Sequence, residues 1–243
     1  MDKRIFVVGI GPGDKGMLTP DAYKALHASD VLVGYPLYLD LLGEEFAEKE
    51  QLSTPMRKER ERCVLCLQEA DKGKTVSLVS SGDPGVYGLA SLMLEVGRDR
   101  PDIPITVIPG ITAALSGAAV LGAPVNHDFC LISLSDLLTP WEVIEKRLCA
   151  AAAGDFVIVI YNPASRKRPE HLKKAVEILL RSLPGERPCG LVENIGRDGM
   201  KSEICMLAEL GWKEANMFTT VFIGSSATEV IGGRLVTKRG YSR

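Results

Sequence analysis

The chain has 243 residues, of which 46% are hydrophobic and 25% are charged, and its formal net charge is −2 at pH 7. This composition excludes a largely disordered chain, and the small net charge gives no general attraction to nucleic acid or to an anionic membrane. The apolar runs are too short to span a bilayer, and the amino terminus leads directly into a strand pattern without a secretory signal. We therefore expect a cytoplasmic protein with no nucleic-acid or membrane partner.

The amino-terminal half predicts alternating strands and helices. Residues 4–10 form an apolar strand pattern, Thr19 is an N-cap before Pro20, and the next strand covers residues 30–34. A strand, a helix and a strand in this order predict a right-handed crossover and a parallel sheet. Further strands are expected at 75–79 and 105–108, with helices at 20–28, 36–42, 56–70, 89–96 and 111–119.

The first strand is followed by glycines at the spacing of a dinucleotide-binding loop. Gly11, Gly13 and Gly16 match the pattern G-x-G-x-x-G. Pro12, however, lacks the amide that would bind a pyrophosphate, and the second strand ends at Gly34 without an acidic residue for a ribose. The pattern favours a tight turn that shapes a cleft, and an NAD-binding dehydrogenase remains an alternative from another class of enzyme.

The most distinctive stretch is the loop 80–88, which follows the predicted strand 75–79. It contains three glycines, a proline and Asp83. Glycines let the backbone approach a ligand closely, and open α/β sheets bind ligands at the carboxyl ends of their strands. The sequence therefore predicts a small cofactor at this loop. Thr112 is a second candidate, because free amides and a hydroxyl at the start of a helix can both bond a ligand.

Two of the six cysteines, Cys63 and Cys66, form a C-x-x-C pair. The pair lies within the predicted helix 56–70, so the two thiols are expected about one turn apart on that helix. A zinc site needs further ligands at a matching spacing, and neither the other cysteines nor the three histidines supply them. We therefore expect reduced cysteines and no metal.

A domain boundary is expected after Pro124, which gives two α/β domains, residues 1–124 and residues 125–243. The final third of the chain has short strands with little helix between them, which predicts a mixed sheet. Polar turns follow three strands of this half, and together with the loops of the first half they predict a ligand cleft between the domains. These turns are 133–136, 161–165 and 193–197; the expected strands are 129–134, 156–160, 189–192, 202–207, 218–223 and 234–236, and the expected helices are 141–152 and 169–183.

Four motifs in the first half resemble those of the tetrapyrrole methylase family of S-adenosylmethionine-dependent enzymes. They are Gly9–Asp14, Leu18-Thr19, Ser81–Pro84 and Pro109–Ala114. Further stretches are similar to the branch of this family that methylates C17 of precorrin-3B in cobalamin biosynthesis, namely Ser80–Gly88, His127–Phe129, Ser133–Trp141, Tyr161–Pro163 and Ile231–Arg234. The resemblance covers essentially the whole chain, and the run Ser133–Trp141 is specific to this branch.

The resemblance implies an α/β protein whose first domain has a mostly parallel sheet and whose second has a mixed sheet, with S-adenosylmethionine between them, and a homodimer. It also implies methylation of C17 on precorrin-3B or its cobalt form, cobalt-factor III, with ring contraction to (cobalt-)precorrin-4 and release of S-adenosylhomocysteine. A methylase of another ring carbon and a non-catalytic tetrapyrrole carrier remain alternatives. The resemblance assigns to the cofactor Pro12, Ser81, Gly82, Asp83, Val86, Tyr87, Thr112, Ala113, Tyr161, Asn162, and Gly196 or Gly224.

The sequence shows no Ser-His-Asp or paired-carboxylate arrangement, and an activated methyl group mainly requires alignment and the exclusion of water. Related uroporphyrinogen methylases carry an aspartate after the second strand where this chain has Tyr35, so that role does not transfer. The candidates for proton handling are Asp14, Glu59, His127 and Asp136. The candidates for binding the carboxylates of a tetrapyrrole are Arg57, Arg60, Arg62 and Arg166, with Lys167 and Arg168 beside the last.

Overall fold

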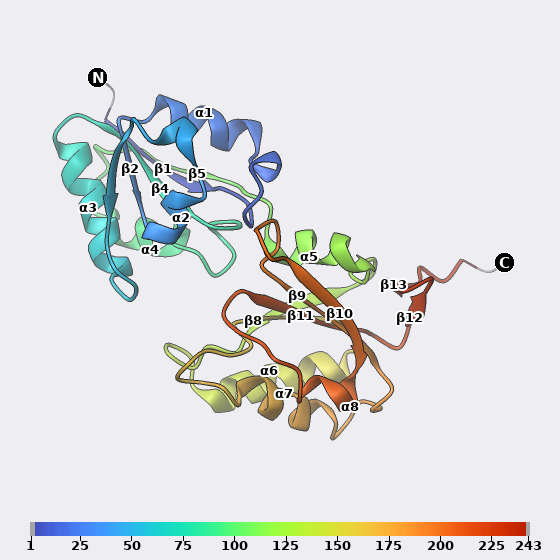
Figure 1. The fold of residues 1–243 in the computed structure, drawn as a ribbon. Helices are drawn as coiled ribbons and strands as arrows, with labels where there is room; N and C mark the ends of the chain where they lie inside the picture. The colour runs from blue at the N-terminus through green and yellow to red at the C-terminus, as the bar shows by residue number, and fades with distance from the viewer. Residues whose placement is uncertain (1–2, 242–243) are drawn as a thin grey trace. The chain divides into compact units, whose positions relative to one another are not determined.

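The computed structural model describes residues 3–241 and divides into two compact units after Ala113. The first unit is built on a five-stranded sheet of order β3-β2-β4-β1-β5, in which each neighbouring pair is parallel. The predicted parallel sheet of the first half is therefore confirmed. Its strands (Figure 1) are β1 (Arg4–Gly9), β2 (Val31–Gly34), β3 (Glu50–Ser53), β4 (Thr75–Ser80) and β5 (Ile105–Ile108).

Helices cover both faces of this sheet. Ile5 and Val7 of β1 point into the core that α3 and α4 cover, whereas Val8 points into the core beneath α1 and α2. Thr19 caps α1 as predicted, because its hydroxyl accepts a hydrogen bond from the Ala22 amide at 3.2 Å. The helices are α1 (Pro20–Ala28), α2 (Pro36–Asp40), α3 (Glu59–Asp71) and α4 (Ala90–Val96), with short 3-10 helices η1 (Lys15–Met17) and η2 (Glu44–Phe46).

The C-x-x-C pair lies in the core of the first unit. Cys63 and Cys66 are one turn apart on α3, as predicted, and both side chains are fully buried. Burial raises the pKa of Cys63 to about 11 and holds the pKa of Cys66 well above its usual value. Since the thiolate is the reactive form, burial suppresses the reactivity of both side chains at neutral pH.

The second unit contains a five-stranded mixed sheet of order β10-β9-β11-β8-β7. The β7–β8 pair is parallel and the other pairs are antiparallel, which confirms the predicted mixed sheet. A small sheet of order β12-β13-β6 completes the unit. The strands are β6 (Gly122–Ala123), β7 (Phe129–Ser133), β8 (Val157–Tyr161), β9 (Pro188–Glu193), β10 (Lys201–Met206), β11 (Thr219–Ile223), β12 (Thr228–Ile231) and β13 (Arg234–Thr237).

The five-stranded sheet of the second unit is also covered on both faces (Figure 1). Val221 and Ile223 of β11 point into the core shared with α6, α7 and α8. Phe222 points the other way, toward α5, where a Cβ placed on Gly117 would lie 2.9 Å from the phenyl ring. The helices are α5 (Ala113–Leu121), α6 (Trp141–Ala153), α7 (His171–Leu179) and α8 (Leu207–Leu210).

The division between the compact units falls at the first residue of α5, after Ala113, whereas a domain boundary is expected from the sequence after Pro124. Helix α5 packs closely on the second sheet, because a Cβ placed on Gly190 of β9 would lie 2.6 Å from Leu121. The small residues of α5 therefore serve its approach to this sheet, and the helix belongs with the second unit.

Two features are absent from residues 3–241. None of their helices is both long enough and apolar enough to cross a lipid bilayer. Within the same residues, no group of three or more histidine, cysteine, aspartate or glutamate side chains is arranged to hold a metal ion.

Candidate functional site

Three loops lie side by side at the carboxyl edge of the first sheet. Strands β4, β1 and β5 are parallel neighbours, so the loops that follow them, 81–88, 10–14 and 109–112, share one edge. Their backbones leave no room for a side chain at Gly9, the last residue of β1, since a Cβ placed there would lie 2.6 Å from the Gly82 oxygen and 2.7 Å from the Gly110 nitrogen. The cofactor residues predicted in the first half are therefore brought to one edge of the sheet.

The first glycine turn is bonded to the loop 81–88 rather than free. The Gly82 amide donates to the Gly11 oxygen at 2.7 Å, and the Gly11 amide donates to the Gly82 oxygen at 3.2 Å. Both residues have a positive φ, 75° for Gly11 and 69° for Gly82, which explains the need for glycine. Because these amides are occupied, they are not available to a pyrophosphate. The geometry thus favours the tight turn over a dinucleotide-binding loop.

The Asp83 carboxylate joins two of the three loops. Its Oδ1 atom accepts a hydrogen bond from the Gly85 amide at 2.8 Å, and its Oδ2 atom accepts one from the Gly110 amide at 3.0 Å. The Val86 amide closes the turn by donating to the Asp83 carbonyl oxygen at 3.2 Å. Hydrogen bonds to an ionised group are stronger than neutral ones, so Asp83 fixes the shape of the candidate cofactor loop.

The same edge offers open space and an unused polar group. A Cβ placed on Gly82 would approach no atom closer than 3.9 Å, where it would face Thr112 and Ala113. The buried hydroxyl of Ser80, at the end of β4, has no hydrogen-bond partner among the described residues. Unpartnered buried polar groups are rare in folded proteins. The open space beside Gly82, lined by backbone groups, fits a small polar ligand, and the buried Ser80 hydroxyl lies at the end of the neighbouring strand.

In the second unit, β7, β8 and β9 run in the same direction, and the three predicted polar turns follow them at one edge. The Asn162 side chain donates to Ser133 Oγ at 3.0 Å, and the Tyr161 hydroxyl accepts from the Ala114 amide at 2.8 Å. Asn162 and Gly196 have positive φ values of 53° and 68°, typical of tight turns. Tyr161, Asn162 and Gly196 are therefore brought to a common edge.

Two predicted site residues lie at the opposite edge of that sheet. Strand β11 is antiparallel to β8, so Gly224 follows it near the start of β9, where its amide bonds the Pro188 oxygen at 2.9 Å. His127 precedes β7 and lines a cavity of about 300 Å³ with Asp155 and Ser226. The structure therefore groups Gly224 and His127 with each other rather than with the polar turns. We do not retain either residue in the candidate site.

Asp136 belongs to a polar cluster that the sequence did not reveal. His171 Nε2 lies 3.1 Å from Asp136 Oδ2, and Arg168 Nη1 lies 3.4 Å from Asp136 Oδ1. The neighbouring His171 side chain is the main reason that the pKa of Asp136 is lowered. A lowered pKa makes this carboxylate a weaker base, which argues against proton abstraction by Asp136. No sequence motif links His171 to Asp136, which explains why the pair was missed.

The other two candidates for proton handling have local structural roles. Asp14 caps η1 by accepting a hydrogen bond from the Gly16 amide at 2.6 Å. Glu59 accepts a hydrogen bond from the Arg57 amide at 3.2 Å, just before α3 begins. Both carboxylates therefore stabilise the backbone at the start of a helix.

The arginines predicted to bind substrate differ in exposure. Arg57, Arg60 and Arg166 are exposed and form no ion pair with another described residue. Arg62 is only 4% exposed, and its guanidinium donates to two backbone carbonyl groups just after β3, at 2.9 and 3.2 Å. It also lies over the Tyr35 ring, 5.9 Å from the centroid. Arg62 therefore has a structural role, and we withdraw it as a substrate ligand.

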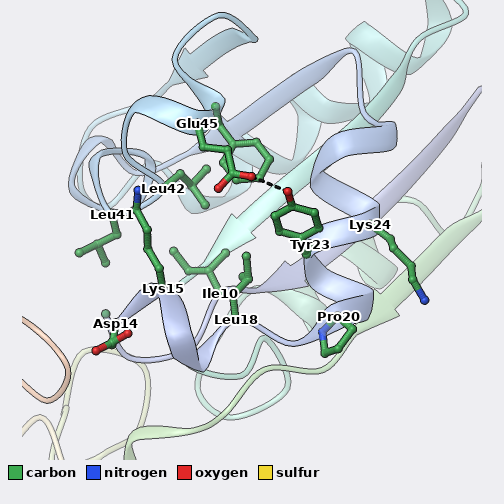
Figure 2. A pocket seen from close by; sticks show the side chains of 12 residues that line it. Ile10, Asp14, Lys15, Leu18, Pro20, Tyr23, Lys24, Leu41, Leu42 and Glu45 are labelled. Atoms are coloured by element: carbon green, nitrogen blue, oxygen red, sulfur yellow. Dashed lines mark hydrogen bonds between the residues drawn. The ribbon is translucent and has the colours of Figure 1, made fainter.

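A cavity of about 470 Å³ opens beside the first glycine turn (Figure 2). Its lining includes apolar side chains such as Ile10, together with Tyr23 and Glu45. The Tyr23 hydroxyl donates to Glu45 at 2.5 Å, and this bond, followed by the one from His27, lowers the pKa of Glu45. The cavity therefore presents an ionised carboxylate beside an apolar surface.

A parallel sheet covered on both faces, with glycine-rich loops at its carboxyl edge and a second mixed α/β unit, is typical of α/β enzymes that bind a small ligand. The family model of the tetrapyrrole (corrin/porphyrin) methylases matches residues 4–211, and the chain belongs to this family. The resemblance inferred from the motifs is thereby confirmed. So is the predicted enzyme class, a methyltransferase.

Individual relatives are similar over nearly the whole chain. A probable cobalt-factor III C(17)-methyltransferase from Salmonella typhimurium is 44% identical over 237 residues, which is 97% of this chain and 98% of that protein. A precorrin-3B C(17)-methyltransferase from Sinorhizobium sp is 39% identical over 95% of this chain and 92% of that protein. The crystal structure of the methyltransferase CobJ matches with a TM-score of 0.91 and 36% identity, over 97% of this chain and 99% of that one.

Proposed function

We propose that the protein transfers a methyl group from S-adenosylmethionine to C17 of precorrin-3B or of its cobalt form, cobalt-factor III, with ring contraction to (cobalt-)precorrin-4. The observation that carries this proposal is the similarity, along nearly the full length of both chains, to relatives with this named activity. The presence of the stretch Ser133–Trp141, which resembles the same branch, supports it.

The residues at the edge of the first sheet fit the proposed cofactor. S-adenosylmethionine supplies a methyl group already activated on a sulfonium, so the protein has to bind it, orient it and exclude water. Asp83 keeps the loop 81–88 in shape and adds a negative charge that complements the sulfonium. We retain as cofactor contacts Pro12, Ser81, Gly82, Asp83, Val86, Tyr87, Thr112, Ala113, Tyr161, Asn162 and Gly196.

The proposed substrate is a macrocycle with several carboxylate side chains, which are ionised at neutral pH. Arg57, Arg60 and Arg166 are exposed cations suited to such groups, because a guanidinium binds a carboxylate through two parallel hydrogen bonds. We further propose a cytoplasmic homodimer, as the resemblance implies, and sedimentation of the purified protein tests the dimer.

The decisive experiment supplies methyl-labelled S-adenosylmethionine with either precorrin-3B or cobalt-factor III. We expect one labelled methyl group on C17 of a ring-contracted product, identified by mass spectrometry and carbon NMR. Label on another carbon would assign a different methylase of the pathway. Tetrapyrrole binding without transfer would indicate a carrier, and calorimetric binding of NAD(H) without binding of S-adenosylhomocysteine would indicate a dehydrogenase.

A further inference from the structure

The loop 133–141, which we call the leucine loop, begins beside a turn that is predicted to bind the cofactor. Ser133 pairs with Tyr161 at the ends of the parallel strands β7 and β8, and the Leu134 amide donates to the Tyr161 oxygen at 2.9 Å. The Asn162 side chain adds its hydrogen bond to Ser133 Oγ at 3.0 Å. The position of the leucine loop is therefore coupled to the turn that contains Tyr161 and Asn162.

The polar side chains of Arg168 and His171 hold the middle of the leucine loop in place. Arg168 Nη1 donates to Ser135 Oγ at 2.6 Å, and His171 Nε2 lies 3.1 Å from Asp136 Oδ2. The His171 ring is buried and packs edge-to-face against Trp141, with the ring centroids 4.9 Å apart. The loop is thus held on both sides of its tip, which lies between Asp136 and Trp141.

The tip exposes apolar side chains although its flanks are fixed. Leu137 is 62% exposed and Leu138 is 94% exposed. Transfer of a leucine side chain from water to an apolar environment lowers the free energy. In the folded chain these two side chains remain exposed to solvent, so a ligand that covered them would gain this free energy. The adjoining loop, joined to the leucine loop through Arg168, exposes Arg166 and Lys167, which form no ion pair with another described residue. An apolar tip therefore stands next to two available cations.

This combination matches the proposed substrate, a broad apolar ring that carries ionised carboxylates. We propose that Leu137 and Leu138 contact the macrocycle of the tetrapyrrole, while Arg166 and Lys167 bind its carboxylates. The inference rests on the proposed function and adds to it the surface of the second unit that receives the substrate. A second copy of the chain is a poorer occupant, because a stable interface buries roughly 800 Å² per partner and the exposed apolar tip consists mainly of two leucines.

The test replaces the most exposed leucine. Leu138 is 94% exposed, so Leu138→Ser removes little packing and the variant is expected to keep its fold. Leu94→Ser on α4, where the side chain is 50% exposed, is the control. Cobalt-factor III is titrated by absorbance and S-adenosylhomocysteine by calorimetry. We expect Leu138→Ser to raise the tetrapyrrole Kd by about tenfold, with the Kd of S-adenosylhomocysteine unchanged and Leu94→Ser equal to the wild type.

Equal tetrapyrrole affinity for Leu138→Ser and the wild type would overturn the inference and leave the proposed function intact. A change of oligomeric state in Leu138→Ser alone, seen by sedimentation, would also overturn it, because the tip would then be an interface between copies. Both results differ from the one expected if the proposed function is wrong. If the proposed function is wrong, the wild-type protein itself would bind neither cobalt-factor III nor precorrin-3B.

Discussion

Asp83 shows how one side chain can shape a site that is made mostly of backbone. The loops after β4 and β5 carry glycines at the points of closest approach, and glycines offer no side chain to hold one loop against the other. The carboxylate of Asp83 performs that task through the amides of Gly85 and Gly110. The loop geometry on which cofactor binding depends therefore rests largely on this residue.

Asp83→Ala tests this role. Without the carboxylate, two amides lose a charge-assisted partner, which is worth about 1.5–3 kcal/mol per bond, and the loop 81–88 is no longer fixed to Gly110. We expect the Kd of S-adenosylhomocysteine, measured by calorimetry, to rise by at least about tenfold, which corresponds to about 1.4 kcal/mol. Asp99→Ala, which removes an exposed carboxylate from the same unit, is the control and is expected to bind normally. Unchanged affinity of Asp83→Ala would show that the loop keeps its shape by other means.

At the scale of residues, the sequence identified the loops better than the roles of individual side chains. It located Asp83, but the bonds to Gly85 and Gly110 follow from the adjacency of β4, β1 and β5, which sequence spacing does not contain. Arg62 belongs to the same charged run of the sequence as Arg57 and Arg60, yet its position on α3 directs its side chain into the protein interior. Burial of a charged side chain depends on tertiary packing, and no local sequence motif indicates it.

At the scale of elements, Asp155 connects the start of β8 to the loop before β12. Its carboxylate accepts hydrogen bonds from the Ser226 amide at 2.8 Å and from the Ser226 hydroxyl at 2.5 Å, and Arg187 lies 3.2 Å away. Partial burial tends to raise the pKa of Asp155, but the hydrogen bonds from Ser226 and the charge of Arg187 outweigh it and leave the pKa below its usual value. The ionised form therefore stabilises the folded state.

Asp155→Asn should reveal this contribution through its pH dependence. Because the pKa is lowered by folding, the stabilisation is present above the ordinary carboxyl pKa of about 3.9 and is lost as the pH falls through the lower native value. We expect the variant to lose on the order of 1 kcal/mol of unfolding free energy at neutral pH. In urea unfolding series, this difference from the wild type should shrink toward acid pH.

The variant is well matched, since Asp155 has a φ of 53°, a conformation that asparagine also tolerates. Asp198→Asn, at an exposed position in the same unit, is the control and should change stability little at any pH. A difference that stays constant from neutral to acid pH would mean that the ionisation of Asp155 does not stabilise the fold.

Two of the elements that escaped prediction, β3 and β6, share a physical cause. Strand β3 (Glu50–Ser53) is a mostly exposed edge strand without alternating apolar residues, and β6 (Gly122–Ala123) is only two residues long. Neither has the hydrophobic period on which sequence-based prediction depends. The position of Gly224 could not be predicted for a related reason, because the direction of β11 is decided by pairing with β8 and β9 and not by its own residues.

At the scale of the whole molecule, the order of the predicted strands and helices predicted the class of fold well. Strands and helices alternate through the first unit, which produces the parallel sheet, and the later succession of short strands produces the mixed sheet. The position of α5 could not be predicted in the same way. Its small residues permit close packing against any partner, and only the structure shows that Phe222 and Gly190 on the second sheet are the partners.

The charge distribution predicts how the tetrapyrrole affinity depends on salt concentration. The net charge of −2 gives the whole chain no long-range attraction for an anionic tetrapyrrole, so any electrostatic contribution comes from local cations such as Arg57 and Arg60. Short-range pairs near the surface weaken as salt shortens the Debye length from about 10 Å at 0.1 M to about 3 Å at 1 M. We expect the tetrapyrrole Kd to rise with sodium chloride, whereas the Kd of S-adenosylhomocysteine, which has no net charge, should change much less.

The double variant Arg57→Ala/Arg60→Ala shows whether these cations cause the effect. If they bind substrate carboxylates, the double variant should bind cobalt-factor III more weakly at low salt, and its affinity should depend less steeply on salt than that of the wild type. Arg98→Ala removes an exposed arginine from elsewhere in the first unit and should leave the slope unchanged. A salt slope that is the same in all three proteins would remove Arg57 and Arg60 from the substrate site. The remaining electrostatic attraction would then have to come from other cations, among which Arg166 and Lys167 beside the leucine loop would be the next to test.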